Sequence, residues 1–491
     1  MGNANTKLEP EKPSAPPDPL IVLVSSLNDA VDALQKVLQV RQLPAFELDS
    51  PIPHPLDSGL PDPVSWFARK AIVGLCSKII ATVESPAERA LVLSNAWLIP
   101  VALNVVIESE PPVVDLIAET GEIGATVTSL AGKTGIDAAK LRSILRVLTS
   151  ESFFKEITPG RYVLNRPSSV LVTGNAIGDL VSFTSGPSMR GGSVLSKALR
   201  HDGLPAGDKY EETVFKQTAF QLYHQKALYP WLMENPRYLT RFHRGMTQLE
   251  LYMDPGISCD YPWEELGESV TLVDVGSGRG GLTMTLLKRF PKWKAVLQDR
   301  AEALSAIREF WEKEATDIVD ADRVSFLAQD FFQVTSLRAT DDSHYVFMIK
   351  NVLHNWGDEH CLKILRNLGP AAAPGSTLLV CTYMPAIPQP DEKHITVKEY
   401  FDGISGKDMR EIQEMHLPIP EPLWADWGYG NAYETRSGAA MTGLLNAAGR
   451  DIYDLRNLLS AASWEVASST QMRSAASMIK AIKLQPAPLP N

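Results

Sequence analysis

Four polar side chains at the ends of expected strands could do chemistry on a bound small molecule. Asp299, Asp330, Lys350 and His354 each lie at or just beyond the end of a short apolar run of the kind found in buried parallel strands. Ligands of such sheets bind outside the carboxyl ends of the strands. A histidine can take a proton from a substrate there. A single histidine is more often a packing or capping residue, but its polar neighbours favour His354 as a catalytic base.

A glycine-rich turn precedes these side chains in the chain. Residues 271–275 predict a buried strand, residues 276–281 read Gly-Ser-Gly-Arg-Gly-Gly, and residues 282–290 have helical spacing. Such a turn lets a ligand approach the backbone closely, and an acid at the end of the next strand, here Asp299, suits a ribose diol.

The glycine spacing by itself leaves three interpretations open. It fits the dinucleotide pattern G-x-G-x-x-G, it fits a G-x-G-x-G methyltransferase loop, and it could be a turn that binds no ligand. Asp274, two residues before the first glycine, disfavours a pyrophosphate and therefore a nicotinamide dehydrogenase, and it suits a cationic ligand that carries an amino acid. S-Adenosylmethionine is the cofactor we expect.

The composition limits the partners. A chain of 491 residues has room for about two to three domains. Its net charge of −11 argues against a nucleic-acid partner, because such binding depends on Lys and Arg. The four cysteines show no C-x-x-C spacing, so we predict neither a metal site nor a disulfide framework. A reducing, cytoplasmic location is the default expectation.

Two stretches bear on membranes. The apolar run at residues 90–107 is interrupted by Ser94, Asn95, Pro100 and Asn104, so we predict a buried helix pair and no transmembrane segment. The first residues are polar and Pro-rich, which predicts no secretory signal. They do match the myristoylation pattern M-G-x-x-x-[ST] at Gly2. One myristoyl chain would give weak, reversible membrane association, and an unmodified tail is the alternative.

The first half of the chain divides into two expected parts. Residues 1–63 form a disordered, Pro-rich region with one amphipathic helix at 20–40. Residues 64–175 form a small helical domain that ends in a winged helix, since two short helices precede a hairpin that turns at Thr158-Pro159-Gly160. DNA binding by this domain is disfavoured because its second helix has few basic residues and the chain is acidic.

The second half contains the expected site. Residues 176–255 form a helical connector that contributes to a substrate pocket, and Asp254-Pro255-Gly256 is expected to end its last helix. Residues 256–485 alternate strands with helices and close with an antiparallel pair at 464–468 and 476–484. We therefore predict a Rossmann-like α/β fold preceded by a mainly helical domain.

The whole pattern resembles one family. Residues 65–485 are similar to the small-molecule O-methyltransferases of plants and fungi, the caffeate and flavonoid type that use S-adenosylmethionine. The resemblance rests on the winged-helix segment and on a set of short motifs, namely Thr218–Leu222, Phe242–Met246, Leu272–Gly281, Leu297–Asp299, Ala328–Phe332, Leu353–Trp356 and Asn446-Ala447 before Arg450.

The resemblance implies roles for individual residues. Gly276 would lie against the methionine part of the cofactor, Ser277 beside it would also bind the cofactor, and Asp299 would hold the ribose. Asp330 with Phe331 would hold the adenine, Lys350 would lie beside the cofactor, and His354 would be the general base. Family members are usually homodimers that interlock through the N-terminal domain, so the winged helix is expected to serve dimerisation. The expected substrate is a small phenolic or polyketide natural product of secondary metabolism.

Three departures from the family pattern concern the histidine. Asn355 stands where the family usually has Asp after the histidine, and Cys381 and Gly449 stand where it has acids that orient the ring. In a serine protease the loss of the orienting acid costs about 10⁴ in kcat. Asp451 could substitute from two residues along. An extra Pro- and Trp-rich segment at 385–433 could also reshape the pocket.

These departures keep a second function open. A fungal relative of this family can be a cyclase or pericyclase, which orients a substrate and polarises a carbonyl without needing a carboxylate to drive deprotonation. Lys350 or His354 could supply the hydrogen bond in such a reaction. We predict an S-adenosylmethionine-dependent O-methyltransferase first, and a pericyclase that binds the cofactor without methyl transfer as the alternative.

Overall fold

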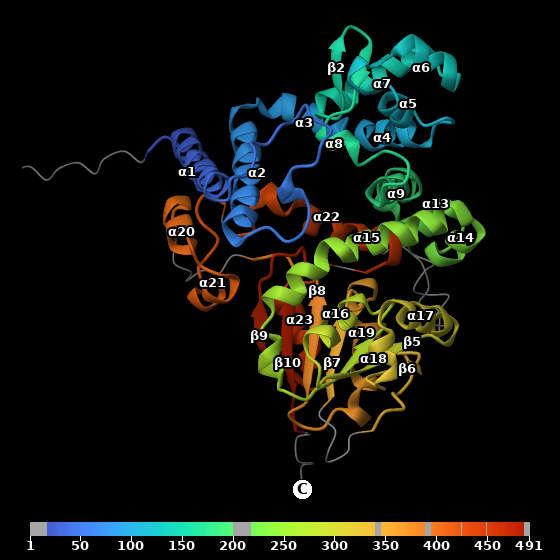
Figure 1. Ribbon diagram of the computed structural model, residues 1–491, viewed down its shortest axis with the longest axis vertical. Coiled ribbons are helices and arrows are strands. Elements are labelled where there is room, and N and C mark those ends of the chain that lie inside the picture. The colour runs from blue at the N-terminus through green and yellow to red at the C-terminus, as the bar shows by residue number, and fades with distance from the viewer. Residues whose placement is uncertain are drawn as a thin grey trace, which may run out of the picture.

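The computed structural model describes residues 17–199, 218–338, 345–387, 394–423, 425–447 and 449–485. The lower half of the molecule in Figure 1 holds a large sheet, and the upper half is mainly helical with one small sheet. The long helix α15 (Pro236–Asp260) lies between the two halves and contacts both. The potential site at the sheet edge therefore faces the helical half.

The lower half is a seven-stranded sheet in the order β6-β5-β4-β7-β8-β10-β9. The first five of these strands run parallel, and β10 is antiparallel to both of its neighbours. The strands are β4 (Thr271–Val275), β5 (Lys294–Asp299), β6 (Val324–Ala328), β7 (Tyr345–Lys350), β8 (Thr377–Thr382), β9 (Trp464–Thr470) and β10 (Ser477–Lys483). The predicted α/β sheet and its antiparallel closing pair are confirmed.

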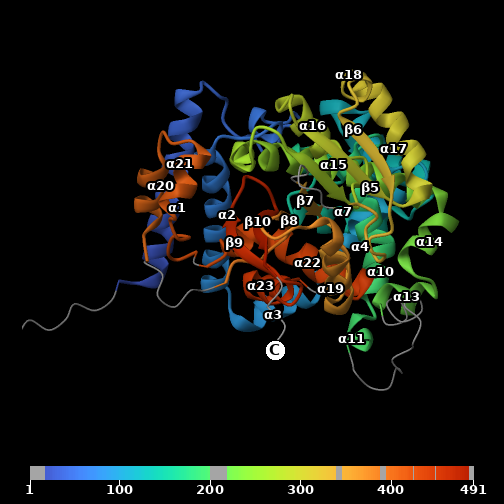
Figure 2. The ribbon, with the colours of Figure 1, turned by 90° about the horizontal axis from the view of Figure 1, so that it is seen from below.

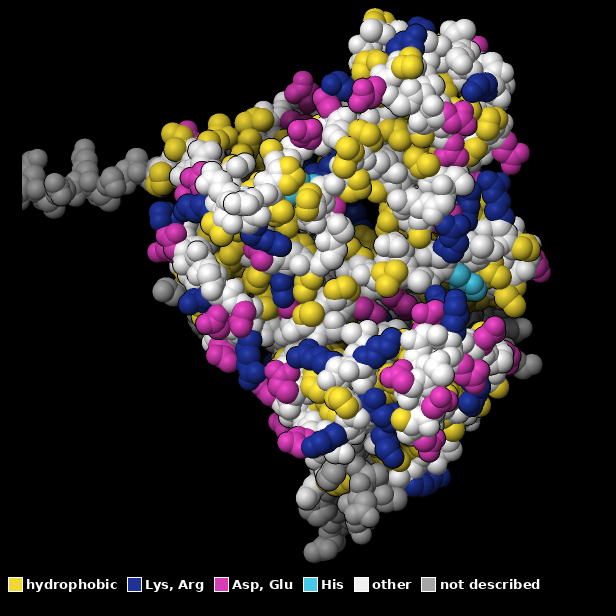
Figure 3. Space-filling view, viewed as in Figure 1, with side chains coloured by type: hydrophobic (Ala, Val, Ile, Leu, Met, Phe, Trp, Pro, Cys, Tyr) yellow, Lys and Arg dark blue, Asp and Glu magenta, His cyan; other side chains and the backbone are white. Residues whose placement is uncertain are grey.

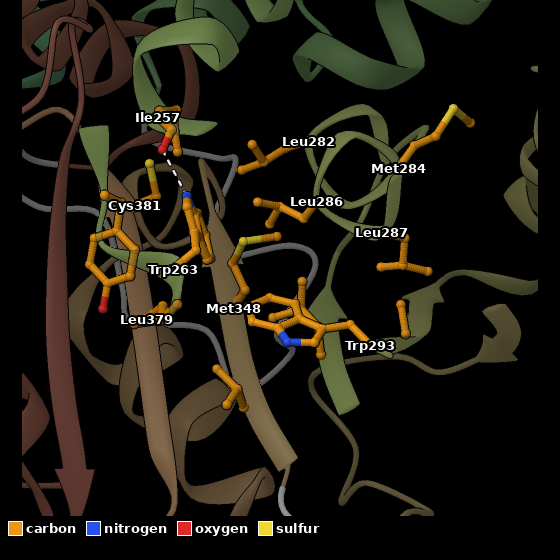
Figure 4. Packing of buried hydrophobic residues seen from close by; sticks show 14 of the residues in the cluster. Ile257, Trp263, Leu282, Met284, Leu286, Leu287, Trp293, Met348, Leu379 and Cys381 are labelled. Carbon is orange, nitrogen blue, oxygen red and sulfur yellow. Dashed lines mark hydrogen bonds between the residues drawn. The ribbon is translucent and has the colours of Figure 1, made fainter. Parts of the chain in front are cut away.

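Helices cover both faces of the sheet, as Figure 2 shows from below. One face is covered by α16 (Gly281–Arg289), α17 (Ala301–Glu314) and α18 (Thr316–Asp320), and the other by α19 (Asp358–Asn367) and α23 (Ile452–Ser460). On the first face Trp263 donates its indole N–H to the carbonyl of Ile257 at 3.0 Å, and Met348, Leu379 and Cys381 lie near it (Figure 4). Burial on both faces explains the continuous apolar strands.

The helical half contains the elements predicted for the domain at 64–175. The turn between α6 and α7 is made by Gly135 with φ +72°, and Asp137 caps α7. A hairpin of β2 and β3 follows, and β1 pairs with β3. The bounds are α4 (Leu98–Glu108), α5 (Val113–Ala118), β1 (Ala125–Thr126), α6 (Val127–Thr134), α7 (Ala138–Ser150), β2 (Lys155–Thr158), β3 (Arg161–Val163), α8 (Arg166–Ser169), α9 (Ala176–Phe183), α10 (Met189–Gly192), α11 (Leu195–Ala198), α13 (Ala219–His224), α14 (Leu228–Glu234) and α22 (Ala432–Leu445).

Two segments far apart in the sequence form one packed unit. Helices α1 (Pro19–Val40) and α2 (Pro63–Val83) share a hydrophobic core with α20 (Val397–Ile404) and α21 (Met409–Met415), and both ribbon views show them together. In the described part of the Pro-rich segment at 385–433, α20 and α21 pack on the N-terminal helices, and Tyr433 at its end contacts Tyr383 beside the pocket.

The linker before α2 is not the loose spacer that the sequence suggested. His54 is buried there; its Nδ1 accepts a hydrogen bond from the Leu56 N–H at 3.1 Å, and its Nε2 lies 2.9 Å from the Pro44 carbonyl oxygen. Because α2 packs on α1, the expected boundary at residue 63 falls inside one packing unit.

Helix α15 corrects a second expectation, since it continues through Asp254-Pro255-Gly256 to Asp260. A Cβ at Gly256 would lie 2.0 Å from the Arg473 carbonyl oxygen, so the glycine is needed for the close approach of the β9–β10 connection. Arg473 also donates to the buried Asp260 carboxylate, with one N–O distance of 2.6 Å. These tertiary contacts stabilise the helical turn after Pro255, although a proline favours the end of a helix.

Helix α3 (Pro86–Ser94) corrects a third expectation. The predicted helix pair forms, but α3 contains no buried residue, and Leu91, Val92 and Leu93 are 65%, 60% and 59% exposed. Within the described residues, Pro86–Glu108 is the one stretch long and apolar enough to cross a membrane, with 17% of its apolar window buried. Because α4 packs in the core of the helical half, that composition is weak evidence for a span.

Candidate active site

The glycine turn after β4 forms an open cradle. Gly276, Gly278 and Gly280 have φ of +69°, +52° and +70°, which favours glycine at each. A Cβ at Gly276 would lie 2.9 Å from Val352 Cγ2, whereas one at Gly278 would meet nothing within 4 Å. The N–H groups of Gly276 and Ser277 are held by the Gln298 carbonyl, at 2.9 and 3.0 Å. The loop is thus fixed from below, and its Gly278 side is open to a ligand.

Two acids mark the ends of the neighbouring strands. Asp299 accepts hydrogen bonds from the N–H groups of Gly278 at 2.9 Å and Arg300 at 2.8 Å, which fixes its carboxylate beside the cradle. Asp330 accepts from the Phe332 N–H at 2.9 Å. The ring of Phe331 lies 3.6 Å from the Cβ position of Gly276, so it borders the cradle. The structure therefore brings the predicted cofactor residues of β4, β5 and β6 together.

Lys350 lies at the end of β7 under helix α15. Its Nζ is 2.8 Å from Asp254 Oδ1, and both side chains are largely buried. Burial alone would lower the pKa of Lys350, but Asp254 and Glu250 more than offset this and raise the pKa above its usual value. Lys350 therefore stays charged. Sequence reasoning missed Glu250 and Asp254, although their i, i+4 spacing on a helix was a signal that they share a face.

His354 lies one turn further along, in a short 3-10 turn (Leu353–Asn355). Its ring stacks on Tyr383, with centroids 5.6 Å apart and planes 11° apart, and both residues line a small pocket with Thr382 and Met441. Burial and the nearby Arg450 charge lower the pKa of His354 to about 4. No hydrogen-bond partner reaches the buried Nδ1 within the described part of the chain. The ring is therefore a neutral imidazole at physiological pH.

In the described part of the chain, the positions where the family carries orienting acids bring no carboxylate to His354. Cys381 is fully buried in the sheet core, and a Cβ at Gly449 would contact only Gly438, at 3.7 Å. Asp451, the suggested substitute, caps α23 by accepting from the N–H groups of Tyr453 and Asp454. Asn355 donates to the Asn351 carbonyl at 3.2 Å. The departures seen in the sequence are thus real differences in the site.

Arg450 occupies the place beside the histidine turn instead. Its guanidinium donates to the carbonyls of Leu353 at 3.0 Å and Trp356 at 2.7 Å, and it pairs with Asp358 at 2.7 Å. The side chain is almost fully buried, so these bonds fix the turn that carries His354. Sequence reasoning used Arg450 only as the end of a motif and missed this role.

Comparisons with known proteins agree on the family. A family model for the O-methyltransferase domain matches residues 210–405. An O-methyltransferase of Armillaria gallica is 26% identical over 470 residues, which covers 92% of this chain and 95% of the relative. The 3-O-methyltransferase 2 of Phanerochaete chrysosporium is 26% identical over 425 residues, covering 84% and 86%. The chain belongs to the S-adenosylmethionine-dependent small-molecule O-methyltransferase family.

Solved structures share the fold of this O-methyltransferase-family chain. The mitomycin 7-O-methyltransferase MmcR matches with a TM-score of 0.58 and 23% identity over 81% of this chain and 98% of its own. A protein described as a pericyclic reaction enzyme matches with a TM-score of 0.59 and 14% identity over 94% and 100%. These identities show the shared fold alone, which both kinds of enzyme use.

The cradle fits the cofactor of this O-methyltransferase family. S-Adenosylmethionine is the family's methyl donor, and when bound it supplies a methyl group on a positively charged sulfur. The open side of Gly278 leaves room for it, Asp299 is oriented to accept from ribose hydroxyls, and Phe331 offers a ring face or edge to a base. No cluster of three or more potential metal ligands occurs among the residues that the structure describes.

The position of Asp274 in the sequence suggested that it acts on the ligand. In the structure its carboxylate is bonded to the helix after the glycine turn instead. It is 4% exposed, and its Oδ2 accepts from the Thr283 hydroxyl at 2.6 Å, which ties β4 to α16. Burial, opposed by the Thr283 bond and Lys350, raises the pKa of Asp274 to about 6. Its function in this family member is therefore to hold the helix after the glycine turn.

We expect Asp274→Asn to change the free energy of unfolding, relative to the wild-type protein, more favourably at neutral pH than in acid. The folded pKa lies above the unfolded value, so the wild-type contribution is full below about pH 4 and is lost as the pH rises through about 6. The shift corresponds to as much as about 3 kcal/mol. Urea unfolding of both proteins below and above that range measures it. An equal difference in unfolding free energy at both pH values would contradict the prediction.

Proposed function

We propose that this protein transfers a methyl group from S-adenosylmethionine to a hydroxyl of a small natural product. One observation carries the proposal. Val352 Cγ2 lies 2.9 Å from the Cβ position of Gly276, so the turn that leads to His354 starts against the cofactor cradle. A methyl group held in the cradle and a hydroxyl held at His354 would thus be neighbours, which is what an in-line transfer requires.

The acceptor we propose is a phenolic or polyketide compound of secondary metabolism, and the relatives agree with transfer to oxygen. Two are named as the 3-O-methyltransferase 2 and the 4-O-methyltransferase 1 of Phanerochaete chrysosporium, and another is the O-methyltransferase tpcA of Aspergillus fumigatus. Among structures of the same fold, NcsB1 is described in complex with S-adenosylmethionine and a hydroxy naphthoic acid. A flat hydroxylated ring would also suit the faces of Tyr383 and the neighbouring Tyr433.

The chain's own residues would divide the work. The glycine cradle and Asp299 would bind and orient the cofactor. The ion pair between Lys350 and Asp254 would hold α15 against the end of β7. Tyr383, whose hydroxyl donates to Met253 Sδ at 3.2 Å, fixes the wall of the acceptor pocket. His354 contacts the acceptor oxygen. The buried setting excludes water from the reacting atoms.

Mass spectrometry tests the function directly. The purified protein is incubated with isotope-labelled S-adenosylmethionine and a panel of phenols and enolisable polyketides. We expect labelled product from at least one hydroxylated ring. A protein that binds the cofactor yet labels no member of a broad panel would contradict the proposal.

A second candidate function is a pericyclic reaction with bound cofactor. The observation that favours it is the neutral His354, whose buried Nδ1 has no hydrogen-bond partner among the described residues, because such a reaction needs a hydrogen bond but no carboxylate-driven deprotonation. The shared fold with a pericyclic reaction enzyme is compatible with it. The same incubations distinguish the two functions, since a pericyclase would return an isomerised substrate of unchanged mass and no label.

We also propose a homodimer that uses the helical half, in which α6, α7 and the β2–β3 hairpin would form a winged helix for assembly. The exposed apolar side chains of α3, among them Leu91, Val92 and Leu93, are suited to burial against a second copy. Val92→Asp should shift the mass measured by sedimentation from dimer to monomer. Val334→Asp, at a similarly exposed position (58% against 60%) outside the helical half, is the control. A wild-type monomer would contradict the proposal.

We also propose that the protein is cytoplasmic and that its N-terminus gives weak membrane association. Gly2 of the myristoylation pattern lies outside the described residues. Labelling with a myristate analogue in cells, with Gly2→Ala as the control, tests whether the pattern is used. Absence of label in the wild-type protein would leave the protein without this anchor.

A further inference from the structure

The acceptor pocket carries a positive charge where an orienting acid was expected. Arg450 lines the pocket together with His354, Thr382 and Tyr383, and its guanidinium is fixed by two backbone carbonyls of the histidine turn. The positive charge of Arg450 disfavours protonation of the His354 imidazole, and it favours a ligand that carries a negative charge. The pocket therefore prefers a neutral histidine facing an anion.

The other charged and titratable groups around His354 do not reverse this preference. Asp358, from α19, is largely exposed and already pairs with Arg450. Glu434, from α22, pairs with Lys70 at 2.7 Å. Tyr383 lies on the ring face, and burial raises the pKa of the Cys361 thiol to about 11, so it stays neutral.

Cys381 and Tyr433 are the remaining titratable groups near the pocket. Burial raises the pKa of the Cys381 thiol to about 12, so it carries no charge near neutral pH. Tyr433 packs edge-on against Tyr383, with ring centroids 6.1 Å apart. None of these side chains supplies a free carboxylate to the imidazole.

A neutral imidazole of this kind is a weak base. An ordinary phenol has a pKa of about 10, so proton transfer to a group with a pKa of about 4 is unfavourable by roughly 10⁶. A hydroxyl that is acidic enough to ionise in water avoids this step, because it has already lost its proton to the solvent.

We propose that the acceptor binds as an oxyanion, so that the protein selects acidic hydroxyls such as the enols of 1,3-dicarbonyl compounds and phenols activated by a carbonyl group. This rests on the proposed methyl transfer. The His354 imidazole N–H donates a hydrogen bond to the oxyanion. The oxygen forms a bond to the methyl carbon while the carbon–sulfur bond breaks, and the electron pair of that bond stays on sulfur. No proton is taken up by the protein.

A series of substituted naphthols of equal size tests the proposal, with hydroxyl pKa values on both sides of neutrality. We expect transfer to the acidic members, and a pH profile of kcat/KM whose midpoint moves with the pKa of each acceptor. Efficient transfer to weakly acidic members, with one midpoint common to all acceptors, would overturn the inference while leaving methyl transfer established.

Binding provides a readout that does not need turnover. With S-adenosylhomocysteine present, the absorbance of a bound naphthol reports its ionisation, and we expect its apparent pKa to fall below that of the free naphthol. An unchanged or raised pKa would overturn the inference. If no naphthol is methylated but the bound pKa falls, the proposed transfer fails and the anion-binding pocket stands.

Gly449→Glu adds a carboxylate at the pocket, and Gly449→Gln is the matched neutral control. A side chain fits there, since a Cβ at Gly449 would meet only Gly438 Cα, at 3.7 Å, and its carbonyl carbon, at 3.9 Å. We expect the Glu variant alone to raise kcat/KM for weakly acidic acceptors about tenfold, because it lets His354 take a proton. Equal behaviour of both variants would count against the role of the missing acid.

Discussion

Replacing His354 by alanine should lower kcat for methyl transfer about 100-fold or more while leaving cofactor affinity unchanged. The ring is fixed on Tyr383, and the turn that carries it is held by Arg450 through the carbonyls of Leu353 and Trp356. Removal of one such positioned hydrogen-bond donor to a developing or bound oxyanion typically costs about 10² to 10³ in kcat. The residues that line the pocket with the imidazole do not belong to the glycine cradle, so the cofactor should bind as before.

Two measurements separate this effect from misfolding. Single-turnover kinetics with the acceptor found in the labelling screen gives the chemical step, and calorimetry with S-adenosylhomocysteine gives the cofactor affinity. His243→Ala on the exposed face of α15 is the control and should keep full activity. A His354→Ala variant with wild-type kcat would show that the histidine only packs the pocket.

Gly276→Val should weaken cofactor binding about 100-fold or more, which corresponds to a loss of about 2.7 kcal/mol. The residue has φ of +69°, a conformation that costs a β-branched residue strain, and its Cβ would lie 2.9 Å from Val352 Cγ2. Relief of that contact would move either the cradle or the turn toward His354. Calorimetry with S-adenosylhomocysteine measures the loss.

Gly281→Ala is the matched control for this substitution. Gly281 belongs to the same turn, has no positive φ, and a Cβ there would meet only Asp254 Oδ2 at 3.9 Å. We expect nearly wild-type affinity from it. Thermal unfolding of both variants shows whether the valine acts locally. Normal cofactor binding by a folded Gly276→Val protein would mean that the ligand does not use this cradle.

Strand positions and the cofactor residues could be predicted because their signals are local. The run that became β4 has the predicted bounds, since parallel strands buried on both faces are apolar throughout. Asp299 and Asp330 then followed from the rule that such sheets bind ligands at strand ends.

The failures share a different cause, which is contact between distant segments. Helix α15 passes Pro255 because Arg473 and Asp260, 213 residues apart, hold its last turn. Gly449 and Arg450 could be compared with a family pattern, but no local signal shows that a guanidinium takes the place of an acid beside His354. Helix α3 is apolar enough for a core helix, yet none of the described residues buries its side chains.

The shared core of α1, α2, α20 and α21 limits how this chain can be shortened. Val397, Phe401 and Ile404 are buried against segments that precede them by more than 300 residues, including Leu34 and Phe67. An expression clone that starts after the first helix would leave those side chains facing water. Any shortened form of the protein should accordingly keep α1 and α2 together with α20 and α21.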